Sequence, residues 1–200
     1  MSNIAVARIQ REFREVIRSE EAQKNNIKLE LVDDTYTKLR GEISGPPDTP
    51  YEGGRFVVDI DIPETYPFNP PKVKFATRIW HPNVSSVTGA ICLDILKDQW
   101  AAAMTLRTVL ISIQALLASP EPSDPQDEVV ARQYRENMQA FTTTAKHWAQ
   151  VYGGVQSKDI VCEKKIKQLV DMGFDVEQSR TALSMHSWNV ERAIESLFNQ

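Results

Sequence analysis

Between residues 27 and 75, apolar and polar residues alternate in four short runs, which is the two-residue period of a β-strand. The clearest run is FVVDIDI at 56–62, and weaker runs lie at 27–31, 39–43 and 73–75. Turn-forming stretches such as SGPPDTPYEGG connect the runs, with no helical stretch between them. The pattern therefore predicts a four-stranded antiparallel meander.

Outside this region, apolar residues recur every three or four positions, as in an amphipathic helix. Thr105 is placed to cap a strongly apolar helix that ends before Pro120. The predicted fold class is α+β: an N-terminal helix, a four-stranded antiparallel meander and C-terminal helices, followed by a small three-helix bundle. The first helix would bury Ile9, Phe13, Val16 and Ile17, and the later helical stretches lie at 129–134, 141–152, 160–171, 175–185 and 190–199.

This pattern predicts two domains. Residues 1–152 hold the strands and the longer helices, residues 153–159 form a short linker, and residues 160–200 hold three short helices. About forty residues is close to the lower limit for a domain without disulfides or a metal. We therefore expect the second domain to bind a partner and to carry no chemistry of its own.

Composition argues against several classes of function. The chain has 200 residues, 42% of them hydrophobic, and a net charge of −4 without a block of Lys or Arg, so nothing indicates nucleic-acid binding. No apolar run approaches the roughly 18 residues that span a membrane, and Arg8 and Arg11 interrupt the first apolar stretch, which argues against a secretory signal. Two cysteines far apart and three scattered histidines predict no metal site and a reducing compartment, the cytoplasm and also the nucleus.

Cys92 lies in HPNVSSVTGAICLD, residues 81–94, and is the candidate nucleophile. The nearest histidine in sequence is His81, beside Pro82, and no Cys-His-Asn arrangement typical of a hydrolase is evident. A thiol that attacks an existing thioester needs positioning more than a strong base, because one thiolate replaces another of similar basicity. These features favour a carrier of activated acyl groups over an amide hydrolase, with space-filling as the alternative role of Cys92.

Asn83 offers a side-chain amide in the same segment. Such an amide can donate to the oxyanion of a tetrahedral intermediate, and losing a donor of this kind typically costs about a hundredfold in rate. Asparagine is also a common turn residue, so a role in holding the loop is the alternative.

Four linked motifs in residues 1–152 resemble those of ubiquitin-conjugating enzymes. They are YPFNPP at 66–71, HPN at 81–83, GAICLD at 89–94 and QW at 99–100, in that family's order and near its spacing. The layout of helix, meander and helices predicted above is also the family's architecture. The resemblance implies that Cys92 takes the C-terminus of ubiquitin as a thioester from an activating enzyme and passes it to a lysine amine or to a ligase cysteine.

The resemblance also implies roles for the residues around Cys92. Asn83 would stabilise the oxyanion or hold the loop. Asp124, in SDPQ, would orient the acceptor lysine and accept or relay its proton, with an Asp-Pro turn as the alternative. Leu93 and Asp94 would contact the basic tail of ubiquitin. No cofactor is expected, since ATP is used by the activating enzyme.

Two partner surfaces follow from the resemblance. Arg8 and Arg11, in a basic stripe on the first helix, resemble the site read by the activating enzyme, with a solvated face as the alternative. The surface for RING-type ligases would consist of Pro67, Phe68, Ala102 and Ala103. This loop reads AAA at 101–103, where the family commonly has Ser-Pro-Ala, which predicts a weaker dependence on a ligase.

Residues 160–200 resemble a ubiquitin-associated (UBA) domain, because an MGF turn follows the first helix and an apolar pair ends the third. In that family these features form a patch for the hydrophobic face of ubiquitin, and so small a bundle cannot bury every large apolar residue. Cys162 has no partner motif and is expected to pack or to lie at the surface. The predicted patch consists of Met172, Gly173, Phe174, Leu197 and Phe198, with Met172 and Phe198 the most exposed.

Together the two domains predict an enzyme that builds polyubiquitin chains, because a tethered ubiquitin-binding domain raises the concentration of ubiquitin near Cys92. The resemblance implies a proteasome-directed linkage, and ubiquitin, the activating enzyme, RING-type ligases and substrate proteins as partners. Two other functions stay open: a carrier for another ubiquitin-like modifier, and a non-catalytic ubiquitin-binding adaptor, which the presence of Cys92 disfavours.

Overall fold

The alternating runs form one antiparallel sheet, with strand order β1-β2-β3-β4, in the computed structural model, which describes residues 2–199. The central pair aligns Lys38 with Asp61 and Ser44 with Arg55. Phe56, Val58 and Ile60 are buried, so the alternation correctly identified the inward face. The strands are β1 (Lys28–Leu31), β2 (Lys38–Ser44), β3 (Arg55–Asp61) and β4 (Lys72–Phe75).

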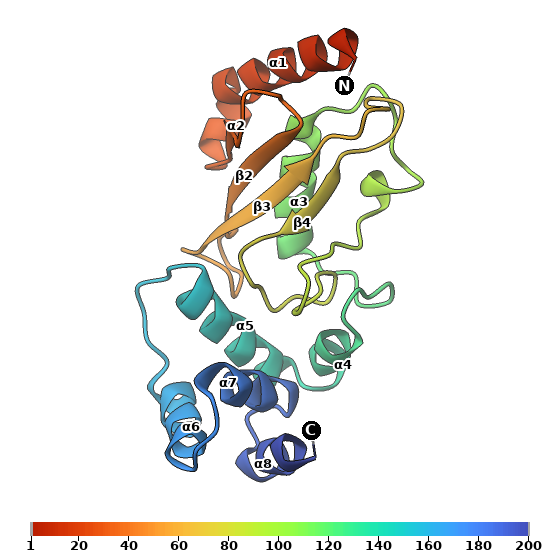
Figure 1. Ribbon diagram of the computed structural model, residues 1–200. Helices are drawn as coiled ribbons and strands as arrows, with labels where there is room; N and C mark the ends of the chain where they lie inside the picture. Colours follow the sequence, from red (N-terminus) through yellow and green to blue (C-terminus); the bar gives the residue numbers. More distant parts are fainter. Residues whose placement is uncertain (1, 200) are drawn as a thin grey trace.

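Two helices pack with the sheet: α3 (Leu106–Ala118) lies behind it, and α1 (Asn3–Arg18) crosses its upper end (Figure 1). The Thr105 side chain accepts a hydrogen bond from Thr108 N and caps α3, as its position predicts. The helix approaches the sheet closely at Gly41, where an added Cβ would lie 2.7 Å from a methyl carbon of Leu110. The predicted helix–meander–helix layout is thus confirmed.

The predicted first helix is present and is followed by a short helix that the sequence analysis did not predict. Ser19 ends α1 and caps this short helix, α2 (Glu20–Lys24). Ile17, predicted to be part of the apolar stripe, is 51% exposed, whereas Val16 is buried. Successive helical residues point about 100° apart, so Ile17 lies at the edge of the stripe and faces away from the sheet.

The remaining helices pack below the sheet in Figure 1. They are α4 (Glu128–Glu136), α5 (Met138–Tyr152), α6 (Ile160–Asp171), α7 (Val176–Met185) and α8 (Val190–Phe198). Helices α6 to α8 form a bundle with its own small core, which includes Ile166, Leu169 and Leu183. Within residues 2–199, no helix is long and apolar enough to cross a membrane.

Buried hydrogen bonds join this bundle to α4 and α5. Trp148 Nε1 donates to Ser184 Oγ at 2.9 Å, and Trp188 Nε1 donates to Thr144 Oγ1 at 2.9 Å. Gln133 Nε2 donates to Ser184 O at 3.0 Å. Because such groups lose their partners and become costly if the bundle moves away, the bundle has a defined position against α5.

A cluster of charged and polar side chains also joins α7 to the first domain. Arg78 Nη1 lies 3.0 Å from Glu177 Oε2, and Tyr152 donates its hydroxyl to the same carboxylate. Arg180 Nε donates to His147 Nε2 at 3.1 Å. Burial, aided by the charge of Arg180, lowers the pKa of His147 to about 4, so this histidine is neutral at pH 7.

Candidate active site

Cys92 lies on a loop that is held in place by two isolated β-bridges. The bridge between Lys74 and Ala90 joins the loop to β4, and the bridge between Val84 and Ile91 joins two parts of the loop. The loop needs a glycine at Gly89, where φ is +77° and an added Cβ would stand 2.0 Å from Phe75 O. Cys92 N donates to Asn83 O at 2.9 Å. These contacts bring the HPN and GAICLD motifs side by side and fix the position of the thiol.

The amide of Asn83 is fully used in holding a second segment of chain. Asn83 Nδ2 donates to Glu121 O at 2.8 Å and to Asp124 O at 3.0 Å, and Glu121 N donates to Asn83 Oδ1 at 2.8 Å. The side chain is 1% exposed. A side-chain amide has two N–H donors, so no donor of Asn83 is left for an oxyanion in this conformation, and its observed contacts are those of a loop support.

His81 is buried and is not a base for Cys92. Its Nε2 lies 2.9 Å from Leu116 O, and its Nδ1 accepts from Asn83 N at 3.0 Å. Burial lowers the pKa of His81 to about 4, although the hydrogen bond to Leu116 acts in the opposite direction. The neutral ring with its proton on Nε2 satisfies both contacts, and its function is to brace the HPN turn.

Two charged groups flank the sulfur of Cys92. Asp124 Oδ2 lies 3.5 Å from Sγ, where a protonated thiol can donate to it, and Lys97 Nζ lies 3.2 Å from Sγ, where a thiolate can accept. The contact with Cys92 raises the pKa of Lys97. The site therefore offers a partner to each protonation state of the thiol.

Lys97 was not predicted from the sequence. It follows a one-turn 3₁₀ helix, η1 (Asp94–Leu96), and its N–H donates to Asp94 O at 2.9 Å. This turn folds the chain back so that a side chain five residues after Cys92 returns to the sulfur. The only signal in the sequence is that spacing, which is uninformative unless the turn is known.

Leu93 and Asp94, expected to contact the tail of ubiquitin, differ in exposure. Leu93 is half-buried and packs against the main core, whereas Asp94 is exposed. Of the two side chains, Asp94 is the one open to a charged partner.

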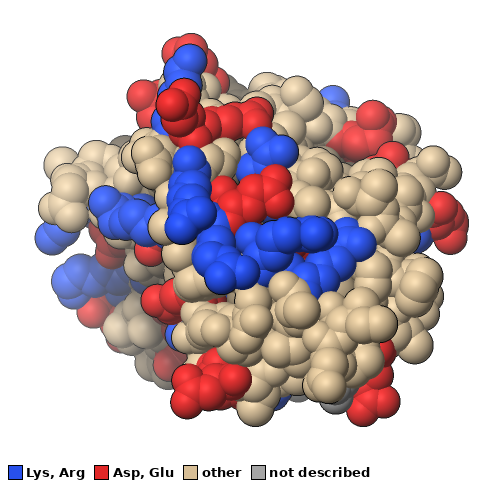
Figure 2. All heavy atoms as spheres, turned by 90° about the horizontal axis from the view of Figure 1, so that it is seen from above, with Lys and Arg blue, Asp and Glu red and all other residues tan. Residues whose placement is uncertain are grey.

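Arg8 and Arg11 also differ, although the sequence analysis grouped them. The Arg8 side chain is 18% exposed, donates from Nη2 to Met104 O at 2.7 Å and lies over the ring of Tyr66. Arg11 is exposed. Lys and Arg side chains gather on the face seen in Figure 2, the side on which α1 lies. Of the pair, Arg11 is the one open to solvent, and Arg8 mainly joins α1 to the loop before α3.

The predicted ligase surface is assembled by a contact between two loops. Trp100 Nε1 donates to Pro67 O at 2.8 Å, which brings the YPFNPP loop to the AAA loop. Phe68 is 82% exposed at this place, Ala103 is exposed and Ala102 is half-buried. The ring of Phe68 therefore offers apolar area that is open to a partner.

The predicted patch on the bundle has two open members. Phe198 is 71% exposed and Met172 is 51% exposed. The ring of Phe174 stands edge-on to that of Phe198, 5.3 Å between centroids, while Phe174 and Leu197 pack partly against the second core. Gly173 is exposed between them.

Cys162 is 1% exposed and lies in the core of the bundle. Burial raises the pKa of its thiol well above the usual value, which suits a packing residue and not a nucleophile. Among residues 2–199, no three His, Cys, Asp or Glu side chains are grouped so that they could hold a metal ion.

Comparison with known proteins gives concordant matches. The family model for ubiquitin-conjugating enzymes matches residues 8–149, and that for the UBA/TS-N domain matches residues 163–197. The chain is 65% identical over 199 residues to ubiquitin-conjugating enzyme E2 K of Homo sapiens and 63% identical over 199 residues to ubiquitin-conjugating enzyme E2-22 kDa of Drosophila melanogaster, covering 100% of each chain in both cases. Among solved structures, the E2 domain of a ubiquitin-conjugating enzyme of Toxoplasma gondii aligns with a TM-score of 0.68 and 50% identity over 74% of this chain and 98% of that one. A putative ubiquitin-conjugating enzyme of Plasmodium yoelii aligns with a TM-score of 0.71 and 46% identity, over 76% and 97%.

Proposed function

The chain belongs to the ubiquitin-conjugating enzymes, transferases that work through a cysteine thioester, and from this premise we propose that Cys92 is the cysteine that carries ubiquitin. The observation that supports this most is the setting of the sulfur, which lies between Lys97 and Asp124, with no histidine hydrogen-bonded to it among residues 2–199. Residues 1–152 would act as the catalytic domain, 153–159 as the linker and 160–200 as the ubiquitin-binding domain.

Charging is a transfer between two sulfurs. The Cys92 thiolate attacks the carbonyl carbon of the thioester held by the activating enzyme, a tetrahedral intermediate forms, and the activating enzyme's cysteine leaves as a thiolate. Lys97 can stabilise the attacking thiolate through its ammonium group, 3.2 Å away. No cofactor is proposed for this chain, since ATP is consumed by the activating enzyme, and the proposed compartment is the cytoplasm and also the nucleus.

The test of this function is a charging assay. The protein, activating enzyme, ATP and ubiquitin are incubated and separated on gels with and without a thiol reductant. A reductant-sensitive adduct of one ubiquitin is expected. Charging by a related modifier in the absence of charging by ubiquitin would replace this proposal with the alternative of another ubiquitin-like protein.

Substituting Lys97 should slow charging while the protein stays folded. Lys97→Gln is expected to lower the rate about three- to tenfold, because the cation beside the sulfur is lost from an exposed position. Lys97→Arg should retain most of the rate, since a positive charge remains. The measurement is the single-turnover rate of thioester formation, together with thermal unfolding. Equal rates for the Gln variant and the native protein would exclude this role.

Discharge is the attack of a lysine amine on the Cys92 thioester. The amine must lose its proton to act as a nucleophile, and the Asp124 carboxylate lies 3.5 Å from the sulfur, where it can orient the amine and accept or relay that proton. The nitrogen–carbon bond forms as the carbon–sulfur bond breaks, and Cys92 is released as a thiolate.

Asp124→Ala should slow discharge to free lysine about tenfold and leave charging largely intact. The measurement is the loss of the preformed thioester after lysine is added. Asp124→Asn serves as the matched variant: it keeps the shape but not the charge, so slow discharge in both variants supports a role for the charge. Equal slowing of charging and discharge would instead indicate a general disturbance of the loop.

The open patch of the bundle is proposed to bind ubiquitin and to favour chain building. Replacing Met172 and Phe198 by Ala should reduce free chain formation about three- to tenfold, because apolar area of both residues is open to a partner. Charging should not change. Ile160→Ala, at another exposed apolar residue of the bundle, is the matched control. If the double variant forms as much chain as the native protein, the patch on the bundle has no role in chain building.

A bundle that is docked on the catalytic domain places bound ubiquitin differently from a bundle that hangs on a free linker. Because buried contacts join α7 to α5, ubiquitin on the patch would stand at a set place relative to Cys92. We propose chain extension with a proteasome-directed linkage, aided by RING-type ligases at Pro67 and Phe68 and by the activating enzyme at Arg11 and its neighbours.

A further inference from the structure

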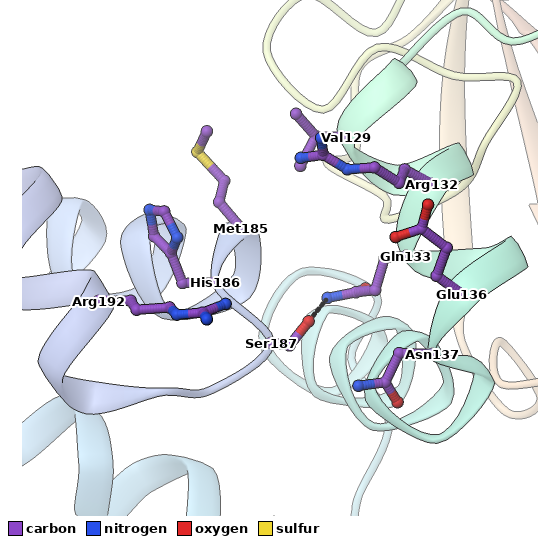
Figure 3. Close-up of a pocket in the computed structure, with 9 residues that line it drawn as sticks. All are labelled: Val129, Arg132, Gln133, Glu136, Asn137, Met185, His186, Ser187 and Arg192. Atoms are coloured by element: carbon purple, nitrogen blue, oxygen red, sulfur yellow. Dashed lines mark hydrogen bonds between the residues drawn. The ribbon is translucent and has the colours of Figure 1, made fainter.

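A groove of about 650 Å³ lies where α4 faces the end of α7 and the start of α8, and none of the roles assigned above uses it. Figure 3 shows Arg132 and Glu136 on the α4 wall and Met185, His186 and Arg192 on the opposite wall. Both domains are needed to form it. The groove is therefore absent from either domain taken alone.

The floor of the groove is fixed by the buried side chain of Gln133. Its Oε1 accepts from Trp80 Nε1 at 2.8 Å, and its Nε2 donates to Ser184 O at 3.0 Å and to Ser187 Oγ at 3.2 Å. All donors of this amide are satisfied within the protein. The walls are thus held apart at a set width before any ligand arrives.

The two arginines in the groove are free to bind a partner. Arg132 and Arg192 are exposed and extend from opposite walls into the space between them (Figure 3), and neither takes part in an ion pair within residues 2–199. Arg135, on the same helix, is by contrast paired with Glu128 at 2.7 Å. Glu136 is the one carboxylate among the lining residues that the structure describes, so the cationic groups outnumber it.

The groove also has an apolar side and an imidazole beside it. Met185 is 44% exposed and its side chain stands on the wall opposite Arg132 (Figure 3). His186, half-buried beside it, can donate or accept a hydrogen bond. This combination suits a peptide with carboxylates for the arginines and an aliphatic side chain for Met185.

Helix α4 connects the groove to the active site. Its capping residue, Asp127, accepts from Ser86 N at 3.0 Å, and its N–H donates to Pro82 O at 3.1 Å, so the helix begins on the loop that carries Asn83. Arg132 lies five residues further on, about 7 Å along the helix axis. The wall that carries Arg132 is therefore built on the loop that packs beside Cys92.

We propose that this groove binds an acidic segment of the acceptor protein and so selects lysines with carboxylates at a distance along the chain. The proposal rests on the proposed function of Cys92, since selection is expressed in the discharge step. Arg132 and Arg192 would each take a carboxylate, and the aliphatic part of the segment would lie on Met185. Binding of this kind weakens as salt rises, because exposed charges are screened over about 10 Å at 0.1 M salt.

The test uses the full chain, charged with ubiquitin, and synthetic acceptor peptides with a single lysine. One peptide has four glutamates placed six residues from the lysine, about 20 Å when extended, and its partner has four glutamines there. The native protein is expected to discharge to the glutamate peptide about three- to tenfold faster. The double variant Arg132→Glu with Arg192→Glu should abolish this preference. A control peptide with four acetylated lysines in place of the glutamates should behave like the glutamine peptide.

Lys164→Glu is the matched control, because it reverses an exposed charge on α6, outside the groove, and should keep the preference. Charging and discharge to free lysine should be unchanged in both variants, which separates a failure of this inference from a failure of the proposed function. A native protein without preference would overturn the proposal, as would a preference that survives the double reversal. Restored discharge when the reversed variant meets a peptide with four arginines would support it directly.

Discussion

Cys92→Ala is expected to abolish the reductant-sensitive ubiquitin adduct, a loss of at least a thousandfold in charging. The reason is that the sulfur is the nucleophile of a covalent route, and no neighbouring side chain can replace it. The substitution removes one atom from a side chain that is 9% exposed, so the cost in stability should be small, about 1 kcal/mol. The measurement is the charging gel, with the free energy of unfolding taken from a urea titration.

Two matched variants sharpen this result. Cys92→Ser should give a slowly formed adduct that resists the reductant, because an oxygen ester replaces the thioester. Cys162→Ala should charge like the native protein, since Cys162 is buried in the bundle and burial disfavours its thiolate. A reductant-sensitive adduct that persists in Cys92→Ala and disappears in Cys162→Ala would reverse the assignment.

Asn83→Ala is expected to slow discharge by about tenfold or more, because Asp124 loses its place, and also to destabilise the protein by about 2–4 kcal/mol. The amide makes three hydrogen bonds to residues 121 and 124, and its removal leaves buried backbone groups without partners. The segment that carries Asp124 would then lose its fixed distance to Cys92. Single-turnover discharge and urea unfolding measure the two effects together.

The pair of measurements decides between the two roles that the sequence left open for Asn83. A residue that acts only on the oxyanion would slow the reaction without changing stability. A residue that holds the loop changes both, and its loss should also slow the charging step, which Asp124→Ala leaves largely intact. Stability equal to that of the native protein would speak against the loop role indicated by the contacts observed.

The docked bundle changes how its effect on chain building is understood. The sequence predicts that the tether alone sets the concentration of bound ubiquitin near Cys92. Trp148, Thr144 and His147 are instead covered by α7 or by Trp188. Truncation after the linker would expose these side chains and disturb the catalytic domain, so surface variants at Met172 and Phe198 test the bundle more cleanly.

The sequence by itself determined most of the elements and the chemical class. The alternation at 56–62 identified the buried face of β3, Thr105 marked the start of α3, and Cys92 without a histidine partner indicated an acyl carrier and not a hydrolase. These features depend on neighbours within a few residues, where chain geometry fixes which side chains share a face. A pattern of this range reports local structure and burial reliably.

Only the tertiary structure decided which distant groups meet. Asn83 holds a segment 38 to 41 residues away, Arg8 turns inward to Met104, and Arg180 meets His147 across the two domains. Lys97 reaches Cys92 because a single turn of 3₁₀ helix folds back. Such contacts depend on the packing of whole elements, which a spacing along the chain does not encode, because one periodicity is compatible with many arrangements of the helices and loops that carry it.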